Sequence, residues 1–356
     1  MTRADAQDVL VVGGGLVGRA VALAAADAGA RVTLIDDRRA GGASGVGAGM
    51  LAPSVERTAE PAQAFLLAAR DAYPADVAGL TERTGVRIPI NTDGILEVAS
   101  DETDAARRRA AAQGEARWLE PRDVLALDPG YSAPWGAVWH ARDGAVDPLP
   151  LLAAYKAALD ACPLVRRVGA SVVERRTRDL LLADGTVLSA ASTVWCTAAW
   201  SGTVPGLPRA IPVHPMRGQM LDLPTCPVRL VAYGGGGYLV PRPDGRTYVG
   251  ATMEDVGFDP TTTGDGLAFL QRVASTLAPA LGGLTPLRHA AALRPMTPDH
   301  LPIIGQDPGD PSLWYACGHG RNGILLGPLT GRVVGAALAG AHVPFDLTPF
   351  SIARFG

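Results

Sequence analysis

Three glycines near the N-terminus and an acidic residue behind them have the spacing of a nucleotide-binding turn. Gly13, Gly15 and Gly18 form GxGxxG directly after the apolar run 9–12, and Asp36 follows. The first glycine permits a tight turn, the second lets a pyrophosphate approach the backbone, and the third lets helix and strand pack closely. The helix N-terminus attracts phosphates, and the carboxylate accepts hydrogen bonds from a ribose. The pattern predicts a bound dinucleotide and leaves NAD and FAD both open.

Two further glycine-rich segments favour FAD. The segment 40–51 follows the ribose-binding acid, and its backbone together with Ser44 could wrap the pyrophosphate from the far side. The alternative is an ordinary surface loop, in which Met50 would be unusual. In the segment 317–328 a strand ends in glycines and a helix begins near Asn322. The free N–H groups of that helix suit the negative charge of a reduced flavin, whereas a nicotinamide gains less from them.

Alternating strands and helices must bring these segments together. Residues 9–12 and 31–35 are expected to be buried strands joined by a helix that ends at Ala30, which makes a βαβ unit. Turns are expected at 184–185 (DG) and 243–245 (PDG). Further helices are expected at 59–85, 148–162, 264–281 and 323–340, and strands at 86–90, 94–99, 171–174, 180–183, 187–188, 193–197, 211–223, 228–252 and 313–316.

The fold class predicted from this order is α/β. A doubly wound, Rossmann-like FAD-binding domain is expected together with an α+β substrate domain built on a mostly antiparallel sheet. Both domains are discontinuous. The FAD-binding domain is assigned to residues 1–85, 146–207 and 288–356, and the substrate-binding domain to residues 86–145 and 208–287.

Composition argues against several other classes of protein. The net charge is −3 and no basic block is present, which argues against a nucleic-acid partner. The four cysteines form no CxxC pair and the six histidines lack metal-ligand spacing, so no metal is expected. No apolar stretch reaches the ~18 residues of a membrane helix, and the N-terminus does not resemble a signal peptide. We expect a reduced, cytoplasmic protein without a membrane partner.

Five blocks run in order from residue 9 to about 335. They are GGGLVG with Asp36, ASGVGAGMLAP (43–53), YLVPRPDGRTYVGATME (238–254), LRPMTPDHLPIIG (293–305) and GHGRNGILLGP (318–328). Together they resemble the glycine oxidase branch of the D-amino-acid oxidase superfamily, an oxidase of the thiamine pathway. The resemblance covers nearly the whole chain and implies the same two-domain fold, with the substrate domain over the flavin.

The resemblance also implies non-covalent FAD. Sarcosine oxidases, a sister branch, tether their flavin through a cysteine at a position that corresponds to Ala292 or lies within one residue of it. The residues implied to contact FAD are Gly13, Gly15, Leu16, Val17, Gly18, Asp36, Asp37, Ala43, Ser44, Ala48, Gly49, Met50, Val172, His319, Gly320, Arg321, Asn322, Gly323, Ile324 and Leu325.

Two arginines are implied to bind the substrate. The resemblance assigns Arg294 to the substrate carboxylate, and a planar guanidinium suits that role because it can form two parallel hydrogen bonds with a carboxylate. The alternative is a salt bridge from Arg294 to Asp299. Arg321 would make a second substrate contact, or would be a plain helix-cap arginine.

Three further residues are implied to line the substrate pocket. Tyr238 and Met253 are expected on paired strands, and Met50 in the second glycine-rich segment. For a tyrosine or methionine on a strand, simple core packing is the alternative. His319 is expected to contact the flavin through its backbone rather than to act as a general base.

The implied reaction needs no catalytic acid or base. The substrate amine loses a proton to solvent, its α-hydrogen leaves as hydride to the flavin, and the imine hydrolyses to an oxo acid and ammonia. O2 would reoxidise the flavin and give hydrogen peroxide. The alternatives are a D-amino-acid or proline-type FAD dehydrogenase with another electron acceptor, an NAD-dependent reductase, and a non-catalytic flavin-binding protein. A homo-oligomer is left open.

Two departures from the family pattern remove side-chain volume near the implied site. Glycine occupies all four positions 234–237 before Tyr238, and Gly320 stands where an aromatic residue is expected. We therefore expect a pocket that is roomier than glycine requires. Sarcosine, a small D-amino acid or a larger amine are the other substrates that the sequence allows.

Overall fold

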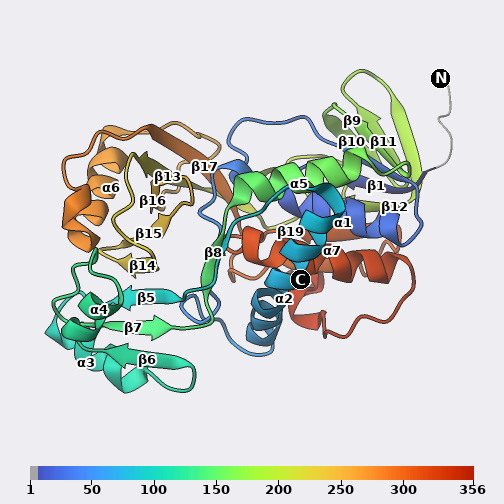
Figure 1. The fold of residues 1–356 in the computed structure, drawn as a ribbon. Helices are drawn as coiled ribbons and strands as arrows, with labels where there is room; N and C mark the ends of the chain where they lie inside the picture. Colours follow the sequence, from blue (N-terminus) through green and yellow to red (C-terminus); the bar gives the residue numbers. More distant parts are fainter. Residues whose placement is uncertain (1–6) are drawn as a thin grey trace.

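Two eight-stranded sheets lie side by side in the computed structural model, which describes residues 7–356 (Figure 1). The first sheet has the order β10-β11-β12-β1-β2-β9, with β19 paired to β12 and β18 to β19. Its parallel strands are β1 (Gln7–Val12), β2 (Val32–Ile35), β9 (Val165–Val168), β12 (Val187–Trp195) and β19 (Leu313–Cys317). Its antiparallel strands are β10 (Val172–Arg176), β11 (Asp179–Leu182) and β18 (Ile303–Gln306).

Both faces of the first sheet are covered, which explains why its central strands are apolar throughout. Val9 and Val11 pack in one core cluster with the main helices, whereas Leu10 and Val12 pack in another with β10 to β12. The helices of the first cluster are α1 (Leu16–Asp27), α2 (Ala62–Thr84), α5 (Pro148–Asp160) and α7 (Gly323–Leu338).

Small residues let α1 and α7 approach each other closely. A Cβ added to Gly331 of α7 would lie 2.7 Å from Cβ of Ala20, and one added to Gly335 would lie 2.7 Å from Cβ of Ala24. Larger side chains would push the helices apart. This packing brings the N-termini of both helices to one groove, where the site lies.

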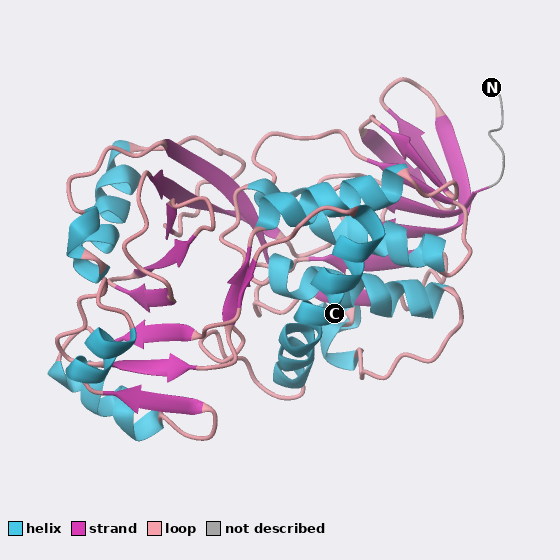
Figure 2. Cartoon of the chain, viewed as in Figure 1, coloured by secondary structure: helices cyan, strands magenta, loops and turns pink. Residues whose placement is uncertain are grey.

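The second sheet has the order β17-β13-β16-β15-β14-β5-β7-β6. Its strands are drawn in magenta in the left half of Figure 2, with helices in cyan beside them. All neighbours are antiparallel except the parallel pair β14 and β5. The strands are β5 (Ile95–Val98), β6 (Ala116–Leu119), β7 (Ala137–His140), β13 (His214–Leu223), β14 (Val231–Gly234), β15 (Gly237–Pro241), β16 (Thr247–Gly250) and β17 (Arg288–Met296). The predicted class of a doubly wound domain beside a mostly antiparallel one is confirmed.

The second sheet and the helices beside it form the second lobe, and the first sheet with its helices forms the first. The helices of the second lobe are α3 (Glu102–Ala111), α4 (Pro121–Leu127) and α6 (Gly264–Leu277). The amphipathic helix α6 buries Leu270, Val273 and Leu277 against the sheet. Short 3₁₀ helices complete the chain: η1 (Ala43–Gly45), η2 (Ala198–Trp200), η3 (Pro279–Leu281), η4 (Thr348–Phe350) and η5 (Ile352–Phe355).

A small third sheet, β3-β8-β4, joins segments of the two lobes. Its strands are β3 (Met50–Leu51), β4 (Ile90–Asn91) and β8 (Gly144–Val146). The strand predicted at 86–90 is wrong for most of its length. Pro89 has no N–H with which to pair with a neighbouring strand. Its carbonyl oxygen accepts a hydrogen bond from the N–H of Asp147 at 2.9 Å.

One predicted domain boundary, between residues 287 and 288, coincides with the start of a strand of the second sheet. Residue 288 begins β17, and this strand pairs with β13 in the second sheet from Arg288 to Met296. We therefore propose that the chain returns to the FAD-binding domain after Met296.

Among residues 7–356, no helix combines the length and apolarity that crossing a membrane requires. No group of three His, Cys, Asp or Glu side chains in the same range could hold a metal ion.

Candidate active site

The turn between β1 and α1 leaves no room for side chains. Gly13 has φ +106°, and a Cβ there would lie 2.3 Å from the carbonyl oxygen of Cys196. A Cβ on Gly18 would lie 1.8 Å from the carbonyl oxygen of Gly13. Only glycine therefore allows strand and helix to meet in this way, which leaves the start of α1 open to a ligand.

The second glycine-rich segment reaches the same helix N-terminus. Ser44, in η1, accepts a hydrogen bond from the N–H of Leu16 through Oγ at 3.0 Å. A Cβ on Gly15 would lie 3.1 Å from that hydroxyl oxygen. The segment 40–51 thus borders the groove at α1 instead of forming a free surface loop.

One end of the groove lies where β2 ends. The Asp37 carboxylate accepts a hydrogen bond from the Ser171 hydroxyl at 2.9 Å and pairs with Arg39. Asp36 accepts the N–H of Arg38 at 3.4 Å, and within residues 7–356 it has no ion pair. The Asp36 carboxylate is therefore the freer acceptor for a ribose. The predicted residues that line this end are Gly13, Gly15, Asp36, Asp37, Ala43, Ser44 and Val172.

The other end of the groove lies at the N-terminus of α7. It is continuous with the first end, because Gly15, Ala43 and Ser44 line both. The predicted residues at this end are Leu16, Val17, Gly18, Ala48, Gly49, Met50, Tyr238, Arg294, His319, Gly320, Arg321, Asn322, Gly323 and Ile324. The Leu325 side chain points away, with 1% exposed, and packs in the core with the helices.

His319 is a buried, neutral residue beside the groove. Its Nε2 lies 3.1 Å from the Thr330 hydroxyl oxygen, and the residue is buried. Burial lowers the pKa of His319 to about 3, because the charged imidazolium would lose its hydration. The imidazole of His319 is therefore uncharged near neutral pH.

Arg294 lines the α7 end of the groove, and the space beside its side chain is called the inner pocket. Its Nη1 donates a hydrogen bond to the carbonyl oxygen of Thr252 at 3.0 Å. Of the residues that the structure describes, no carboxylate forms an ion pair with Arg294. The alternative of a salt bridge to Asp299 is wrong, since Asp299 pairs with Arg354 at 2.6 Å.

Arg321 differs from Arg294 because its charge is compensated. Its Nη2 lies 2.6 Å from Oε1 of Glu56, and the Tyr233 hydroxyl donates to the same oxygen at 2.6 Å. Arg321 is not a plain helix-cap residue: the N-cap of α7 is Asn322. Glu56, which also lines the pocket, was not predicted. Its only local sign is an acidic residue soon after a glycine-rich loop.

Of the three other predicted pocket residues, two face the inner pocket. Tyr238 is buried in β15 and its ring stacks on Tyr248 with centroids 6.2 Å apart, and Met50 of β3 lines the same space. Met253 is placed differently from the prediction. It lies beyond the end of β16, is 51% exposed, and borders a wider outer chamber.

The outer chamber opens from the inner pocket past Tyr238, Arg294 and Arg321, which line both. Glycines 234–237 form part of its wall. A Cβ on Gly236 would meet only the Phe269 ring, at 3.5 Å. At all four positions a Cβ would approach residues of α6, none of which lines the chamber, so a side chain there would pack on α6 and would not fill the approach to the inner pocket.

The groove fits FAD on its own geometry. It is long and continuous, its glycines bring backbone to the ligand, and Asp36 stands free at one end. At the other end the first N–H groups of α7 have no helical acceptors, and Asn322 provides no side-chain cap. Such donors suit an anionic ring system.

Comparisons with known proteins agree with this geometry. Residues 8–337 match the family described as DAO, FAD dependent oxidoreductase. The chain is 34% identical to glycine oxidase of Pseudomonas putida, over 97% of this chain and 98% of that protein. It is 34% identical to the bifunctional protein ThiO/ThiG of Synechocystis sp., over 98% of this chain and 54% of that one.

A solved structure shows the same fold along the full length. The crystal structure of glycine oxidase from Geobacillus kaustophilus aligns with a TM-score of 0.91 and 29% identity, covering 99% of both chains. The ambiguity between NAD and FAD, which the first glycine motif left open, is thereby resolved. The chain belongs to the FAD-dependent oxidoreductase family.

Proposed function

We propose that this protein oxidises glycine or another small amino acid or amine through FAD. The observation that carries the substrate assignment is the uncompensated guanidinium of Arg294 in the pocket that adjoins the FAD groove. A partly buried cation without a carboxylate partner is unfavourable by itself and is satisfied when a ligand carboxylate pairs with it. The names of the glycine oxidase relatives support the same class of substrate.

The pocket favours a substrate with one carboxylate. Arg321 lines the same space, but Glu56 already neutralises it. A second carboxylate would have to displace Glu56 or lie close to it. We therefore expect simple α-amino acids or N-substituted glycines to be preferred over dicarboxylic amines.

The residues of the pocket bind and orient the substrate, and we assign none of them as a general base. His319 is buried and neutral. Burial raises the pKa of Tyr248 well above its ordinary value, so its hydroxyl keeps its proton. The ammonium group of the substrate would lose its proton to water in the outer chamber. When bound, FAD supplies the acceptor for the electron pair of the substrate C–H bond.

FAD is proposed to be held without a covalent bond. Ala292 of β17 lines the inner pocket and offers no nucleophile for a tether there. The residues proposed to hold the cofactor are the groove-lining residues named above, with Leu325 contributing its backbone. We propose O2 as the electron acceptor, with hydrogen peroxide as product. A cytoplasmic location, a role in the thiamine pathway and self-association stay predictions from the sequence.

The first experiment is the visible spectrum of the purified protein under nitrogen, before and after excess glycine. Bleaching of the flavin band near ~450 nm would support the proposal. A yellow protein that glycine leaves unchanged would direct the search to sarcosine, D-alanine and D-proline. A colourless protein that takes up no FAD would contradict it.

Two further measurements complete the test. Peroxide formation in air, compared with reduction of an artificial dye, separates an oxidase from a dehydrogenase. Release of FAD on denaturation tests the non-covalent attachment, since a tethered flavin would stay with the protein.

A further inference from the structure

The guanidinium of Arg294 lies against a glycine in the neighbouring strand. Gly218 of β13 pairs with Ala292 of β17, two residues before Arg294. A Cβ on Gly218 would lie 2.4 Å from Cζ, Nη1 and Nη2 of Arg294. The absence of a side chain at 218 is therefore what allows the guanidinium to occupy this position.

Thr252 fixes the guanidinium from a second direction. Its carbonyl oxygen accepts the hydrogen bond from Arg294 Nη1 at 3.0 Å. Its Oγ1 accepts the N–H of Gln219 at 2.9 Å, and its own N–H donates to the carbonyl of Gln219 at 3.4 Å. Backbone and side chain of Thr252 are thus both tied to β13, beside Gly218.

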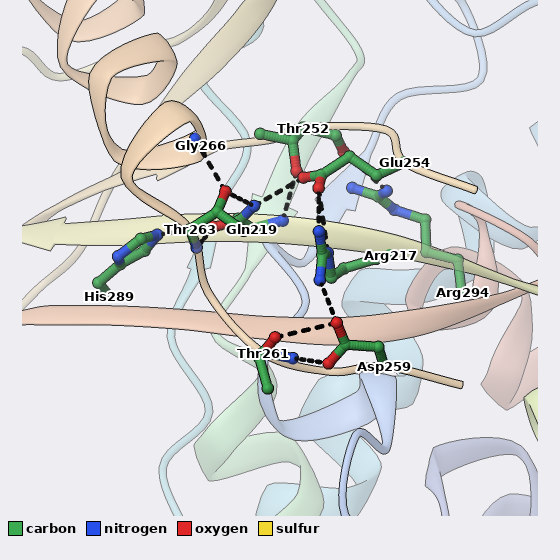
Figure 3. A network of polar contacts seen from close by, with 10 residues as sticks. All are labelled: Arg217, Gln219, Thr252, Glu254, Asp259, Thr261, Thr263, Gly266, His289 and Arg294. Carbon is green, nitrogen blue, oxygen red and sulfur yellow. Dashed lines mark hydrogen bonds and ion pairs between the residues drawn. The ribbon is translucent and has the colours of Figure 1, made fainter. Parts of the chain in front are cut away.

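A network of polar contacts supports Thr252 (Figure 3). The fully buried amide of Gln219 donates to Oε1 of Glu254 at 2.7 Å and to Oγ1 of Thr263 at 2.9 Å. Its oxygen accepts from the N–H of Thr263 at 2.9 Å and lies 3.0 Å from Nε2 of His289. All four hydrogen-bonding positions of the amide are used, so its orientation is fixed.

The loop that carries Thr252 is also held by ion pairs. Arg217 pairs through its guanidinium with Glu254 and, at 2.9 Å, with Asp259. Burial raises the pKa of Glu254, but hydrogen bonds from Thr252, Arg217 and Gln219 outweigh this and lower it. Glu254 therefore stays charged, and its contacts hold the segment 252–259 against β13.

We propose that Thr252 and Gly218 are positioning residues for the substrate: they hold the Arg294 guanidinium in one orientation, ready for a carboxylate. The inference rests on the proposed function of Arg294. Of five guanidinium N–H donors, one is used by Thr252, and the others have no acceptor among residues 7–356 and are left for the ligand. Holding a long arginine side chain before binding lowers the entropy lost when the carboxylate arrives.

The test compares Thr252→Val with Thr252→Ser in the FAD-loaded protein. Valine keeps the size of threonine but removes Oγ1, whereas serine keeps the hydroxyl. We expect Thr252→Val to weaken acetate binding, followed by the flavin absorbance, about tenfold. The substitution removes the Oγ1 contacts to the Gln219 N–H and to Glu254, so the carbonyl that orients Arg294 is no longer held. The KM for glycine should rise by a similar factor, with a smaller change in kcat. Thr252→Ser should stay within about twofold of the native protein.

A double-mutant cycle with Arg294→Ala distinguishes positioning from general loosening. If Thr252 acts through Arg294, Thr252→Val should have no further effect on acetate affinity once Arg294 is absent. An equal effect in both backgrounds would overturn the proposal. So would native affinity in Thr252→Val while Arg294→Ala loses binding, and in that case the proposed function would stand. Native acetate affinity in Arg294→Ala would instead contradict the proposed carboxylate site.

Gly218→Ala provides an independent variant should Thr252→Val not fold. The three atoms nearest to the new methyl all belong to the guanidinium at the end of the Arg294 side chain, so the guanidinium, not the backbone, should move. We expect at least a tenfold loss of acetate affinity with FAD still bound, and no further loss when Arg294 is also alanine. Unchanged affinity in Gly218→Ala would overturn the proposal.

Discussion

Arg321 and Glu56 form an ion pair of 2.6 Å between two loops that border the active-site pocket. The loop of Glu56 is held from behind, because Ser54 donates hydrogen bonds to the buried carboxylate of Asp143 from its N–H and its hydroxyl, both at 2.9 Å. Asp143 is paired in turn with Arg70 at 3.0 Å. The pair therefore belongs to a rigid wall of the pocket.

Glu56→Gln should shift substrate preference toward dicarboxylic amines. The change removes the negative charge that neutralises Arg321, so a second substrate carboxylate can pair with it. We expect kcat/KM for iminodiacetate to rise about tenfold relative to glycine, equal to ~1.4 kcal/mol. Tyr233→Phe, which removes only the hydroxyl donor to Glu56, is the matched control. An unchanged ratio would show that Arg321 does not face the substrate.

Arg294→Ala should leave FAD bound but impair substrate binding. Removing one partner of a buried, hydrogen-bonded charge pair weakens binding by about 2–5 kcal/mol. The loss should appear in kcat/KM for glycine and in the affinity for acetate. Arg294→Lys should be intermediate, because an ammonium keeps the charge without the planar fork. Near-normal kcat/KM in Arg294→Ala would refute the assignment.

Gly18→Ala should weaken FAD binding. The new Cβ would fall 1.8 Å from a backbone oxygen, so the β1–α1 turn must shift. We expect about 10–100-fold lower FAD affinity, which corresponds to ~1–3 kcal/mol. Gly79→Ala, on the exposed side of α2 with no atom within 4 Å of the new Cβ, is the control. FAD titration of the two apoproteins measures the difference, and equal affinities would count against the groove.

His319→Asn should reduce the loss of stability in acid. The native-state pKa of His319 is about 3, below the ordinary 6.5, so between these values the unfolded chain binds more protons. The contribution of neutral His319 to the free energy of unfolding is therefore fully present above pH 6.5. This contribution is lost progressively as the pH falls from 6.5 toward 3. At about pH 5 the loss is ~2 kcal/mol.

Urea unfolding of the FAD-loaded protein at two pH values, one above the ordinary pKa of histidine and one below it, tests whether His319 is held neutral. Between about pH 7.5 and pH 5 the free energy of unfolding of His319→Asn should fall by ~2 kcal/mol less than that of the native protein. An identical pH dependence of the two proteins would mean that His319 is not held neutral.

Much of the cofactor groove could be predicted from local sequence. The βαβ unit with its glycines and Asp36 spans about 30 residues, and within it the chain itself sets how far the acid lies from the turn. The second glycine-rich segment follows directly and has little freedom to lie elsewhere. Two predictions were wrong: a strand over residues 86–90 and a strand position for Met253. Apolar composition alone does not show whether a partner strand is present.

The sequence by itself determined the order of elements, the nucleotide-binding turn and the presence of arginines suited to a carboxylate. Only the tertiary structure decided which arginine is free. Asp299 turned out to pair with Arg354, and Glu56 with Arg321, 265 residues away. Charge pairing depends on distances of a few ångströms between segments remote in the chain. Such distances follow from the packing of whole helices and sheets, which no local spacing encodes.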